Sequence, residues 1–312
     1  MSTRWGMAGL IAMVLADILL VAWAFGLVGG ESDTARPQRP AQTTSATSST
    51  SSPTPAPSPE SQASTVLLDA ASASHALRSA YAPCTTDGPT TAEVERTDDG
   101  GATWEATEVQ ARSVLRVRMM SEQQGFAVVA DDDCEPAVLT TADGGATFSG
   151  PGPATATWGL WPEAGPEVLV PGGRPAKACA AGDAVALSAA DGQLALVLCD
   201  DGSVRRTADA GQTWADAGDV DGAVSLAVRD DQVAVLLTSD GCEGVGVRAG
   251  DLGESLDLGS ETACVEGVSQ PAAISVTEDG GWVSDGGSTK PAAATWSRGQ
   301  PAADEAPLHP VP

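Results

Sequence analysis

Residues 97–104 of this 312-residue chain read TDDGGATW, and two near-copies follow, TADGGATF at 141–148 and TADAGQTW at 207–214. Each octapeptide has Thr at its first position, Asp at the third, Gly at the fifth, Thr at the seventh and an aromatic residue at the eighth. The Asp carboxylate can accept backbone N–H groups across a tight turn, and Gly tolerates the positive φ that such a turn requires. Repeated motifs of this kind are typical of repeat architectures. Each octapeptide is therefore predicted to form a turn between two strands.

The octapeptide resembles the Asp-box, or BNR repeat, of sialidases, sortilin-type receptors and photosystem-assembly factors. The resemblance implies a β-propeller, in which each copy joins the two outermost strands of a blade and packs its aromatic ring beneath the turn. The motif then has a structural role. The structural residues predicted in this way are Thr97, Asp99, Gly101, Thr103, Trp104, Thr141, Asp143, Gly145, Thr147, Phe148, Thr207, Asp209, Gly211, Thr213 and Trp214.

Two degenerate copies, AGDLGESL at 249–256 and VSDGGSTK at 283–290, keep the Asp and Gly but lack the aromatic residue. The long interval between the copies at 141 and 207 fits one blade that has lost its copy. Short flanking segments such as SVLRVRMM and GFAVVA are typical of strands. We predict an all-β fold, a propeller of about six four-stranded blades over residues 66–300, with seven blades as the alternative. Residues 301–312 are predicted to be a disordered tail.

The N-terminal segment 5–28 is apolar except for Asp17 and exceeds the roughly 20 residues that a membrane-spanning helix needs. Arg4 precedes it, and Glu31 and Asp33 follow, which predicts a single-pass anchor with residues 1–4 in the cytoplasm and the bulk of the chain outside. The alternative is a signal peptide cleaved near Ala24, which would leave the protein secreted.

Asp17 would lie near the middle of the bilayer, where a carboxylate costs about 2.5 to 3.5 kcal/mol. This position indicates either a contact with another membrane helix or a protonated acid that the surrounding apolar residues outweigh. Residues 29–65 are rich in Ser, Thr and Pro, and we expect them to form a disordered stalk between the anchor and the propeller.

The formal net charge is −26, and Lys177 and Lys290 are the only lysines. The field of such a chain repels nucleic acid and anionic lipid headgroups, so those partners are excluded. Cationic, neutral or metal-bridged partners remain open.

The cysteines are even in number, which favours disulfides in a compartment outside the cytoplasm. Several connectivities are open, and we predict pairs between sequence neighbours that bridge adjacent blades or the edge of one blade. A zinc site is disfavoured because the only histidines are His75 and His309. The predicted disulfides are Cys84–Cys134, Cys179–Cys199 and Cys242–Cys264.

The sequence does not favour an enzyme. The arginine motif of sialidases has no counterpart, and we expect the sole tyrosine, Tyr81, to pack in the interior rather than act as a nucleophile. Asp131–Asp133 fits a solvated turn better than a calcium loop. Gly244–Ala249 matches a loose dinucleotide-binding pattern without the strand and helix that it needs. We predict a binding or scaffold module for an envelope protein, a peptide or a glycan, with no catalytic, cofactor or metal residues. A divergent sialidase-like exo-glycosidase is the alternative.

Overall fold

The computed structural model describes residues 65–238, 241–259, 263–278, 280–285 and 294–296. These residues form strands and turns, and none of them lies in a helix, so no described segment is a helix that could cross a membrane. The predicted anchor at 5–28 and tail at 301–312 lie outside the described residues. The first strand begins at Thr65, the residue at which the predicted stalk ends.

The described strands form six antiparallel sheets. Three of these sheets have four strands, which pair in the order of the sequence. They are β1 (Thr65–Ala70), β2 (Ala76–Tyr81), β3 (Ala92–Thr97) and β4 (Glu105–Val109); β5 (Ser113–Met119), β6 (Gly125–Ala130), β7 (Pro136–Thr141) and β8 (Ser149–Pro153); and β12 (Ala184–Ala189), β13 (Ala195–Cys199), β14 (Ser203–Thr207) and β15 (Ala215–Asp219).

The other three sheets depart from the predicted four strands: two have three described strands and one has five. In the five-stranded sheet, β19 and β20 both pair with the outer edge of the long strand β18. The strands are β9 (Gly159–Leu160), β10 (Glu167–Val170) and β11 (Arg174–Lys177); β16 (Ala223–Arg229), β17 (Gln232–Leu237), β18 (Gly244–Leu252), β19 (Leu256–Leu258) and β20 (Ala263–Glu266); and β21 (Ala272–Thr277), β22 (Gly280–Asp285) and β23 (Ala294–Trp296).

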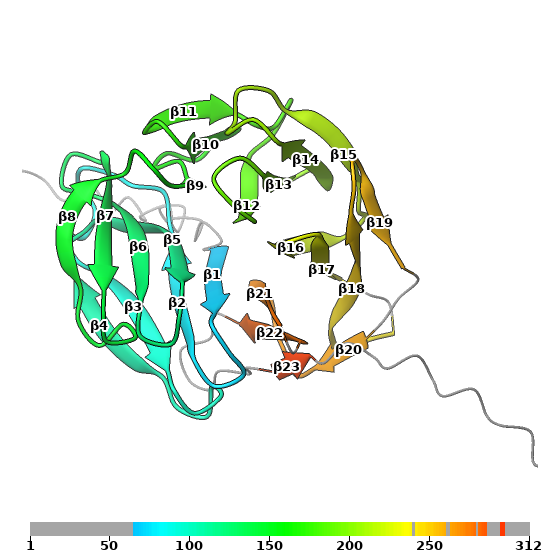
Figure 1. Ribbon diagram of the computed structural model, residues 1–312, viewed down its shortest axis with the longest axis horizontal. Helices are drawn as coiled ribbons and strands as arrows, with labels where there is room; N and C mark the ends of the chain where they lie inside the picture. Colours follow the sequence, from blue (N-terminus) through cyan, green and yellow to red (C-terminus); the bar gives the residue numbers. More distant parts are fainter. Residues whose placement is uncertain (1–64, 239–240, 260–262, 279, 286–293, 297–312) are drawn as a thin grey trace, which may run out of the picture. The chain divides into compact units, whose positions relative to one another are not determined.

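The sheets are arranged in a ring (Figure 1), which makes the fold a β-propeller. One edge strand of each sheet lies at the inside of the ring, in the order β1, β5, β9, β12, β16 and β21. Each inner strand contacts the next, and β21 contacts β1, so the ring is closed. The hydrophobic core lies between neighbouring sheets: Leu77 and Val94 of the first sheet pack with Val117 and Leu139 of the second.

Among the described strands, none of the first sheet pairs with one of the last, and the seam between these two sheets is joined by contacts of individual side chains. The amide of Ala70 donates to Ser275 Oγ at 3.0 Å. The indole Nε1 of Trp282 donates to the carbonyl oxygen of Ser72 at 2.9 Å, and the Trp282 ring meets Trp104 edge-on at 6.4 Å. Trp282 is 1% exposed, so its whole ring is removed from water at this seam.

The long interval between the octapeptides at 141 and 207 contains β9, β10 and β11, a sheet without an octapeptide. The prediction of four strands fails here because only residues 178–183 separate β11 from β12, and because prolines, which cannot donate to a strand ladder, recur through residues 162–175. The copy predicted at 283–290 is also misplaced: Asp285 ends β22, the second strand of its sheet, whereas the three full copies follow the third strand.

Candidate functional site

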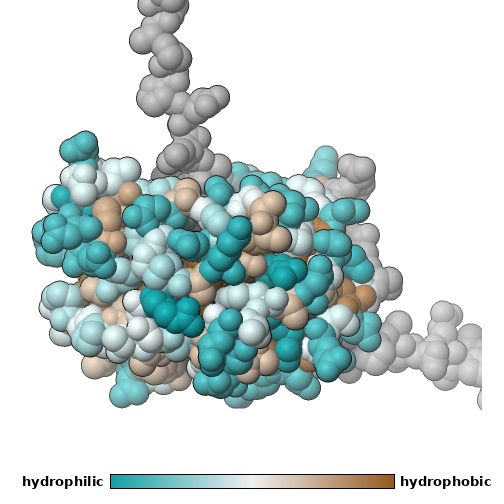
Figure 2. All heavy atoms as spheres, turned by 90° about the horizontal axis from the view of Figure 1, so that it is seen from above, coloured by the Kyte–Doolittle hydropathy of each residue, from teal (hydrophilic) through white to brown (hydrophobic). Residues whose placement is uncertain are grey.

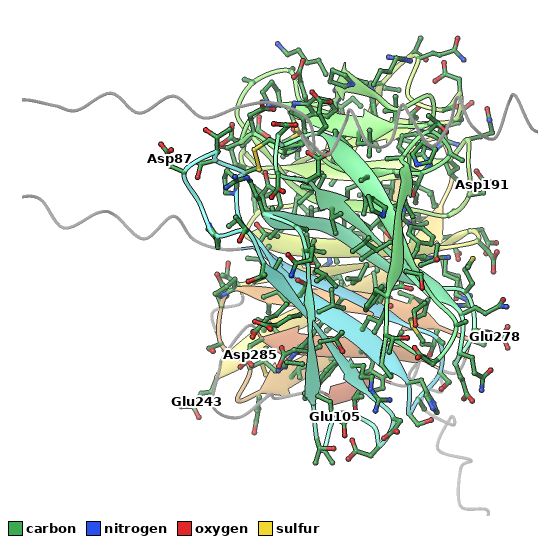
Figure 3. The ribbon with its side chains drawn as sticks, turned by 90° about the vertical axis from the view of Figure 1, so that its left-hand side faces the viewer. Asp87, Glu105, Asp191, Glu243, Glu278 and Asp285 are labelled. Atoms are coloured by element: carbon green, nitrogen blue, oxygen red, sulfur yellow. A yellow bond between two sulfur atoms is a disulfide. The ribbon has the colours of Figure 1, made fainter. Side chains whose placement is uncertain are left out.

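The ring has two ends that differ in how their loops are held. The turn end carries the three octapeptide turns, 97–104, 141–148 and 207–214, and the disulfide end carries the three disulfides. Figure 3 shows Asp191 and Glu278, from first hairpins of two sheets, at the turn end and Asp87 and Glu243 at the opposite, disulfide end.

Each octapeptide turn is bonded to the first hairpin of its own sheet. The amide of Gly100 donates to Ser74 O at 3.1 Å, and the equivalent amide of Gly144 donates to Gln123 O at 2.8 Å. In the third copy the amide of Ala210 donates to the carbonyl oxygen of Gln193 at 3.1 Å. The turn end is therefore a set of paired hairpins, one pair for each octapeptide.

Within the first octapeptide, Asp99 is the centre of a network of hydrogen bonds. Its Oδ1 accepts from Thr97 Oγ1 and from the amide of Thr103, both at 2.9 Å, and its Oδ2 accepts from Thr103 Oγ1 at 2.7 Å. Thr97 Oγ1 in turn accepts from the amide of Gly101, which has the positive φ of 83° expected for this position. The carboxylate thus bonds across the turn as predicted.

Asp143 and Asp209 make the same set of bonds in their own turns. Hydrogen bonds from the following Thr side chain and amide lower the pKa of all three carboxyls, Asp99 included, to about 2. These aspartates are ionised at neutral pH and their oxygens already have partners. Each octapeptide carboxylate therefore stabilises its own turn in the ionised form.

The rest of the octapeptide packs against the preceding sheet of the ring. Trp214 meets Trp158 edge-on at 6.2 Å, as Trp104 meets Trp282, and Phe148 packs on the cluster that contains Leu77. A Cβ built on Gly211 would lie 2.4 Å from Val170 Cγ1 of the neighbouring sheet. The aromatic rings therefore join neighbouring sheets.

At the disulfide end, the cysteines pair as predicted: Cys84 with Cys134, Cys179 with Cys199 and Cys242 with Cys264. Cys84–Cys134 links the β2–β3 loop to the β6–β7 loop and so joins two neighbouring sheets. Cys179–Cys199 ties the segment that enters β12 to the end of β13, and Cys242–Cys264 lies within one sheet. Covalent bonds thus hold loops whose sequences do not repeat.

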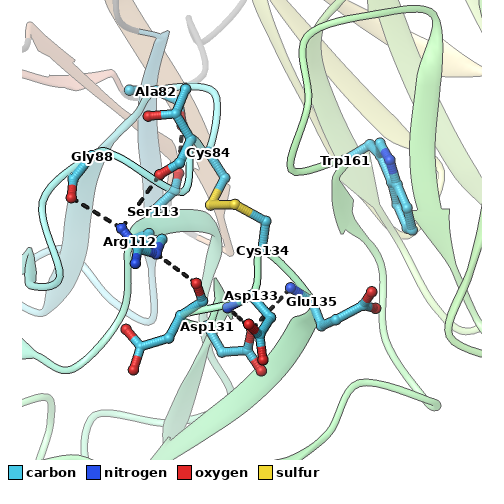
Figure 4. Close-up of a disulfide and its surroundings, with 12 residues drawn as sticks. Ala82, Cys84, Gly88, Arg112, Ser113, Asp131, Asp133, Cys134, Glu135 and Trp161 are labelled. Carbon is cyan, nitrogen blue, oxygen red and sulfur yellow. Dashed lines mark hydrogen bonds between the residues drawn. A yellow bond between two sulfur atoms is a disulfide. The ribbon is translucent and has the colours of Figure 1, made fainter.

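The acidic segment Asp131–Asp133 forms a tight turn beside the first disulfide (Figure 4). Asp131 Oδ1 accepts from the amides of Asp133 and Glu135, both at 2.9 Å. Arg112 Nε donates to the carbonyl oxygen of Asp132 at 2.7 Å. No group of three or more metal-ligating side chains occurs among the described residues. One oxygen of the Asp131 carboxylate is thus used within the turn itself.

A cavity of about 240 Å³ opens at the disulfide end. We call it the mouth cavity; its lining residues come from four separate segments and are Thr65, Tyr81, Pro83, Ala164, Gly165, Asp183, Ala184 and Val185. The Cys179–Cys199 disulfide supports its wall, because Cys179 Sγ contacts the carbonyl oxygen of Asp183 at 3.8 Å. The amide of Cys84 donates to Pro162 O and so fixes the loop that leads to Ala164.

Tyr81 is part of the mouth cavity and is 8% exposed. Its hydroxyl donates to the carbonyl oxygen of Trp161 at 3.0 Å. Burial, together with the negative charges of Asp183 and Glu163, raises the pKa of Tyr81 to about 12. The phenol is therefore protonated at neutral pH and its proton is used in the hydrogen bond to Trp161. Asp183 and Glu163 make the surroundings of the mouth cavity negative.

A second, smaller cavity lies on the ring axis. This axial channel has a volume of about 50 Å³ and is lined by the inner strands β1, β5, β12, β16 and β21. Its charged lining residues are Asp69, Arg116 and Arg118. Arg118 Nη1 binds Asp69 Oδ1 at 3.2 Å. Burial raises the pKa of Asp69 even though Arg118 opposes the shift.

Sequence reasoning did not find the two cavities. Arg116 and Arg118 stand two positions apart in the otherwise largely apolar strand SVLRVRM, which was the available sign of a charged face. The arginines do not line the cavity that contains Tyr81. Gly244–Ala249 lies inside β18, with no helix after it, as expected for a chance match. His75 contacts Ser74 in the β1–β2 hairpin, and His309 lies outside the described residues.

No family model and no curated protein matches the sequence. Solved structures with a similar fold include YCF48 bound to D1 peptide, at 16% identity and a TM-score of 0.30 over 72% of this chain and 61% of that chain. YCF48 from Cyanidioschyzon merolae matches at 14% identity and a TM-score of 0.38, over 72% of this chain and 94% of the other. U3-55K matches at 13% identity and a TM-score of 0.41, over 77% and 93%. This chain thus spans less than two thirds of the first of these structures.

Proposed function

We propose that this chain is a binding or scaffold module that takes its ligand at the mouth cavity. The mouth cavity carries the proposal because it combines a volume of about 240 Å³ with walls that disulfides support. Loops on a rigid scaffold are the usual place for binding residues, and concave sites at the ends of barrels and rings are common. At the turn end, by contrast, the octapeptide aspartates accept hydrogen bonds from their own turns.

The partner classes are an envelope protein, a peptide or a glycan, and the local charge favours one that brings a positive group. Asp183 lines the cavity, and Glu163 acts electrostatically on Tyr81 within it. Trp161 lies across from the Cys84–Cys134 disulfide (Figure 4), and its ring offers a surface for a cation. A lysine or arginine side chain of a peptide meets these conditions.

The molecular surface supports recognition by polar contacts. Hydrophilic residues cover most of the flank drawn in Figure 2, with scattered apolar groups between them. Met120 is the only large apolar side chain among the described residues that is counted as exposed, and it lies at the turn end, after β5. A broad apolar interface over these residues is therefore disfavoured.

The proposal treats the protein as non-catalytic. In a sialidase-like enzyme, a tyrosine nucleophile and an arginine cluster would share one pocket. Here Tyr81 donates to a backbone carbonyl, while Arg116 and Arg118 line the axial channel. These positions favour binding over the exo-glycosidase alternative.

The proposal also includes the finer architecture expected from the sequence. We count each of the six sheets as one blade, with β9–β11 as a reduced blade, and we assign the octapeptides to the Asp-box type on their sequence and hydrogen bonds. Residues 5–28 would anchor the chain in the membrane, and the stalk would hold the ring outside the cytoplasm. Secretion after cleavage near Ala24 remains the alternative.

The binding proposal is tested with the full chain in detergent micelles, immobilised and exposed to lysine-bearing peptides, matched neutral peptides and a glycan array. We expect a preference for the lysine-bearing peptides. Asp183→Asn should weaken that binding about two- to fivefold, the usual size of an exposed charge contact. Asp87→Asn removes the same charge at the same end, away from the cavity lining, and should leave binding unchanged.

Equal binding by the two variants would show that the mouth cavity is not the site. Release of a sugar from an arrayed glycan would replace the binding proposal with the exo-glycosidase alternative.

A further inference from the structure

The axial channel contains more positive than negative charge. Asp69, Arg116 and Arg118 are the only charged residues among the described residues that line it. Two guanidinium groups therefore face one carboxylate, in a chain whose formal net charge is −26. The question is therefore which groups balance the charges of these two arginines.

Each oxygen of Asp69 already accepts one hydrogen bond, one of them from Arg118. Its Oδ1 accepts from Arg118 Nη1 at 3.2 Å, and its Oδ2 accepts from the amide of Met119 at 2.6 Å. Arg229, which also acts electrostatically on Asp69, has its own partner, because its Nη2 lies 3.5 Å from Glu278 Oε1. The positive charge that is left belongs to Arg116.

Arg116 has only weak partners. A bulge between Val114 and Arg116 precedes it on β5, and its guanidinium reaches Trp158 O beside the two-residue strand β9, with Nη1 at 3.4 Å. It also lies 6.0 Å from the centroid of the Phe126 ring. A guanidinium has five N–H donors, so one long bond to a neutral carbonyl leaves most of them for another acceptor.

The guanidinium remains charged in this place. Burial and the nearby charge of Arg118 lower the pKa of Arg116 to about 10, which is still far above neutral pH. The charge of Asp69 offsets part of this shift, but a partly buried charge without a direct ion pair remains incompletely compensated. An anion beside Arg116 would remove that penalty, and guanidinium groups bind carboxylates and other small anions well.

The volume limits the size of the anion. Since one water needs about 10 to 15 Å³ of such space, a channel of about 50 Å³ holds roughly four waters. Chloride or formate fits within this space, and the single excess charge matches a monovalent anion. Thr65 lines both the axial channel and the mouth cavity, so the two spaces adjoin.

We propose that the axial channel binds a small monovalent anion, of the size of chloride or formate, against Arg116 and Arg118. The anion would complete the charge balance at the centre of the ring and hold β5 against the reduced sheet that begins after Trp158. This site is separate from the mouth ligand and stands whether or not the mouth cavity binds a peptide.

Thermal unfolding of the full chain in detergent micelles tests the proposal, with sodium chloride and sodium gluconate compared at equal ionic strength. Matching the ionic strength removes general screening, which affects any chain with this net charge. Chloride at about ten times its Kd should raise Tm by about 3 to 6 °C over gluconate. Arg116→Gln should abolish that difference. Arg174→Gln, which removes an exposed arginine on β11, should keep it.

A second measurement keeps the proposal testable if Arg116→Gln does not fold. The ³⁵Cl NMR signal of a chloride solution should broaden when the wild-type chain is added, and formate should reverse the broadening in competition. Equal Tm values in chloride and gluconate, together with no broadening that formate reverses, would overturn the proposal. Loss of the chloride effect in Arg174→Gln as well would assign it to surface charge and also overturn it.

Discussion

The loops at the two ends of the ring are held in place by different kinds of bond. At the turn end, an Asp carboxylate binds its own turn and the turn binds the neighbouring hairpin, as in Asp143 and the Gly144–Gln123 bond. At the disulfide end, loops of unlike sequence are joined by covalent bonds such as Cys84–Cys134. The turn end uses its polar atoms within the fold, whereas the disulfide end leaves Asp183 at a cavity.

This difference separates fold from function along the chain. The repeated octapeptide marks positions that pack against the preceding sheet, which is why Gly145 and Gly211 both face that sheet. Residues that bind a ligand can differ from loop to loop only at positions that the packing of the sheets does not fix. Disulfides permit such variation because they fix a loop at two atoms and leave its other side chains unconstrained.

The largest expected effect is at the seam near the turn end. Trp282→Ala should lower the free energy of unfolding by about 3 to 5 kcal/mol, because it removes a fully buried ring and leaves a cavity between the first and last sheets. Urea denaturation of the full chain measures this change. Trp161→Ala, at the partly buried ring on the disulfide end, should cost less. Equal costs would show that the seam has no special role in closing the ring.

The disulfide end is tested next by removing its crosslinks in pairs. Cys179→Ala with Cys199→Ala should lower the free energy of unfolding by about 3 kcal/mol, because the crosslink closes a loop with a sequence separation of 20. Cys242→Ala with Cys264→Ala opens a loop of similar separation, 22, at less buried positions. The first pair should therefore cost at least as much as the second in the same urea titration. A larger loss from the second pair would show that burial of the first disulfide adds nothing, whereas a loss far below about 3 kcal/mol from both pairs would contradict the loop-closure argument.

A smaller effect is expected from a single methyl group at the turn end. Gly211→Ala should destabilise the chain by about 2 to 3 kcal/mol, because the new Cβ would meet Val170 Cγ1 at 2.4 Å and the residue has a positive φ of 76°. Gly192→Ala, in a hairpin at the same end with nothing within 4 Å of its Cβ, is the control and should change stability by less than about 1 kcal/mol. A tolerated Gly211→Ala would mean that the octapeptide glycine is needed for its turn alone.

Much of the fold could be predicted from the sequence because its signals are local. The strands around AVALSA and SVRRT are short runs rich in small and β-branched residues between Gly and Asp turns, and they appear as β12 and β14. The octapeptides gave the turn chemistry and their place between the third and fourth strands. The disulfides could be predicted because each joins neighbours in the sequence.

The sites could not be predicted because they depend on distant segments. The mouth cavity combines Thr65, Tyr81, Gly165 and Asp183, which no local pattern links. The reduced sheet was also missed as a three-stranded unit, because β9 has only two residues and prolines obscure its neighbours. Arg116 was visible as a charge in an inner strand, but which arginine forms the ion pair with Asp69 depends on the packing of β1 against β5.

The smallest expected effect is a difference between the two ends in how the melting temperature depends on pH. The folded pKa values of Asp99, Asp143 and Asp209 are about 2, below the ordinary value of an aspartate in an unfolded chain, about 3.9. Their contribution to stability is therefore present above about pH 4 and is lost as the pH falls towards 2. In the triple variant Asp99→Asn, Asp143→Asn and Asp209→Asn, the melting temperature should fall less steeply between pH 4 and pH 2 than in the wild type. Asp87→Asn, at an exposed loop of the disulfide end, should leave that slope unchanged. If the triple variant keeps the wild-type slope, the acid sensitivity lies elsewhere, and the hydrogen bonds of the turn end do not depend on the charge of their aspartates.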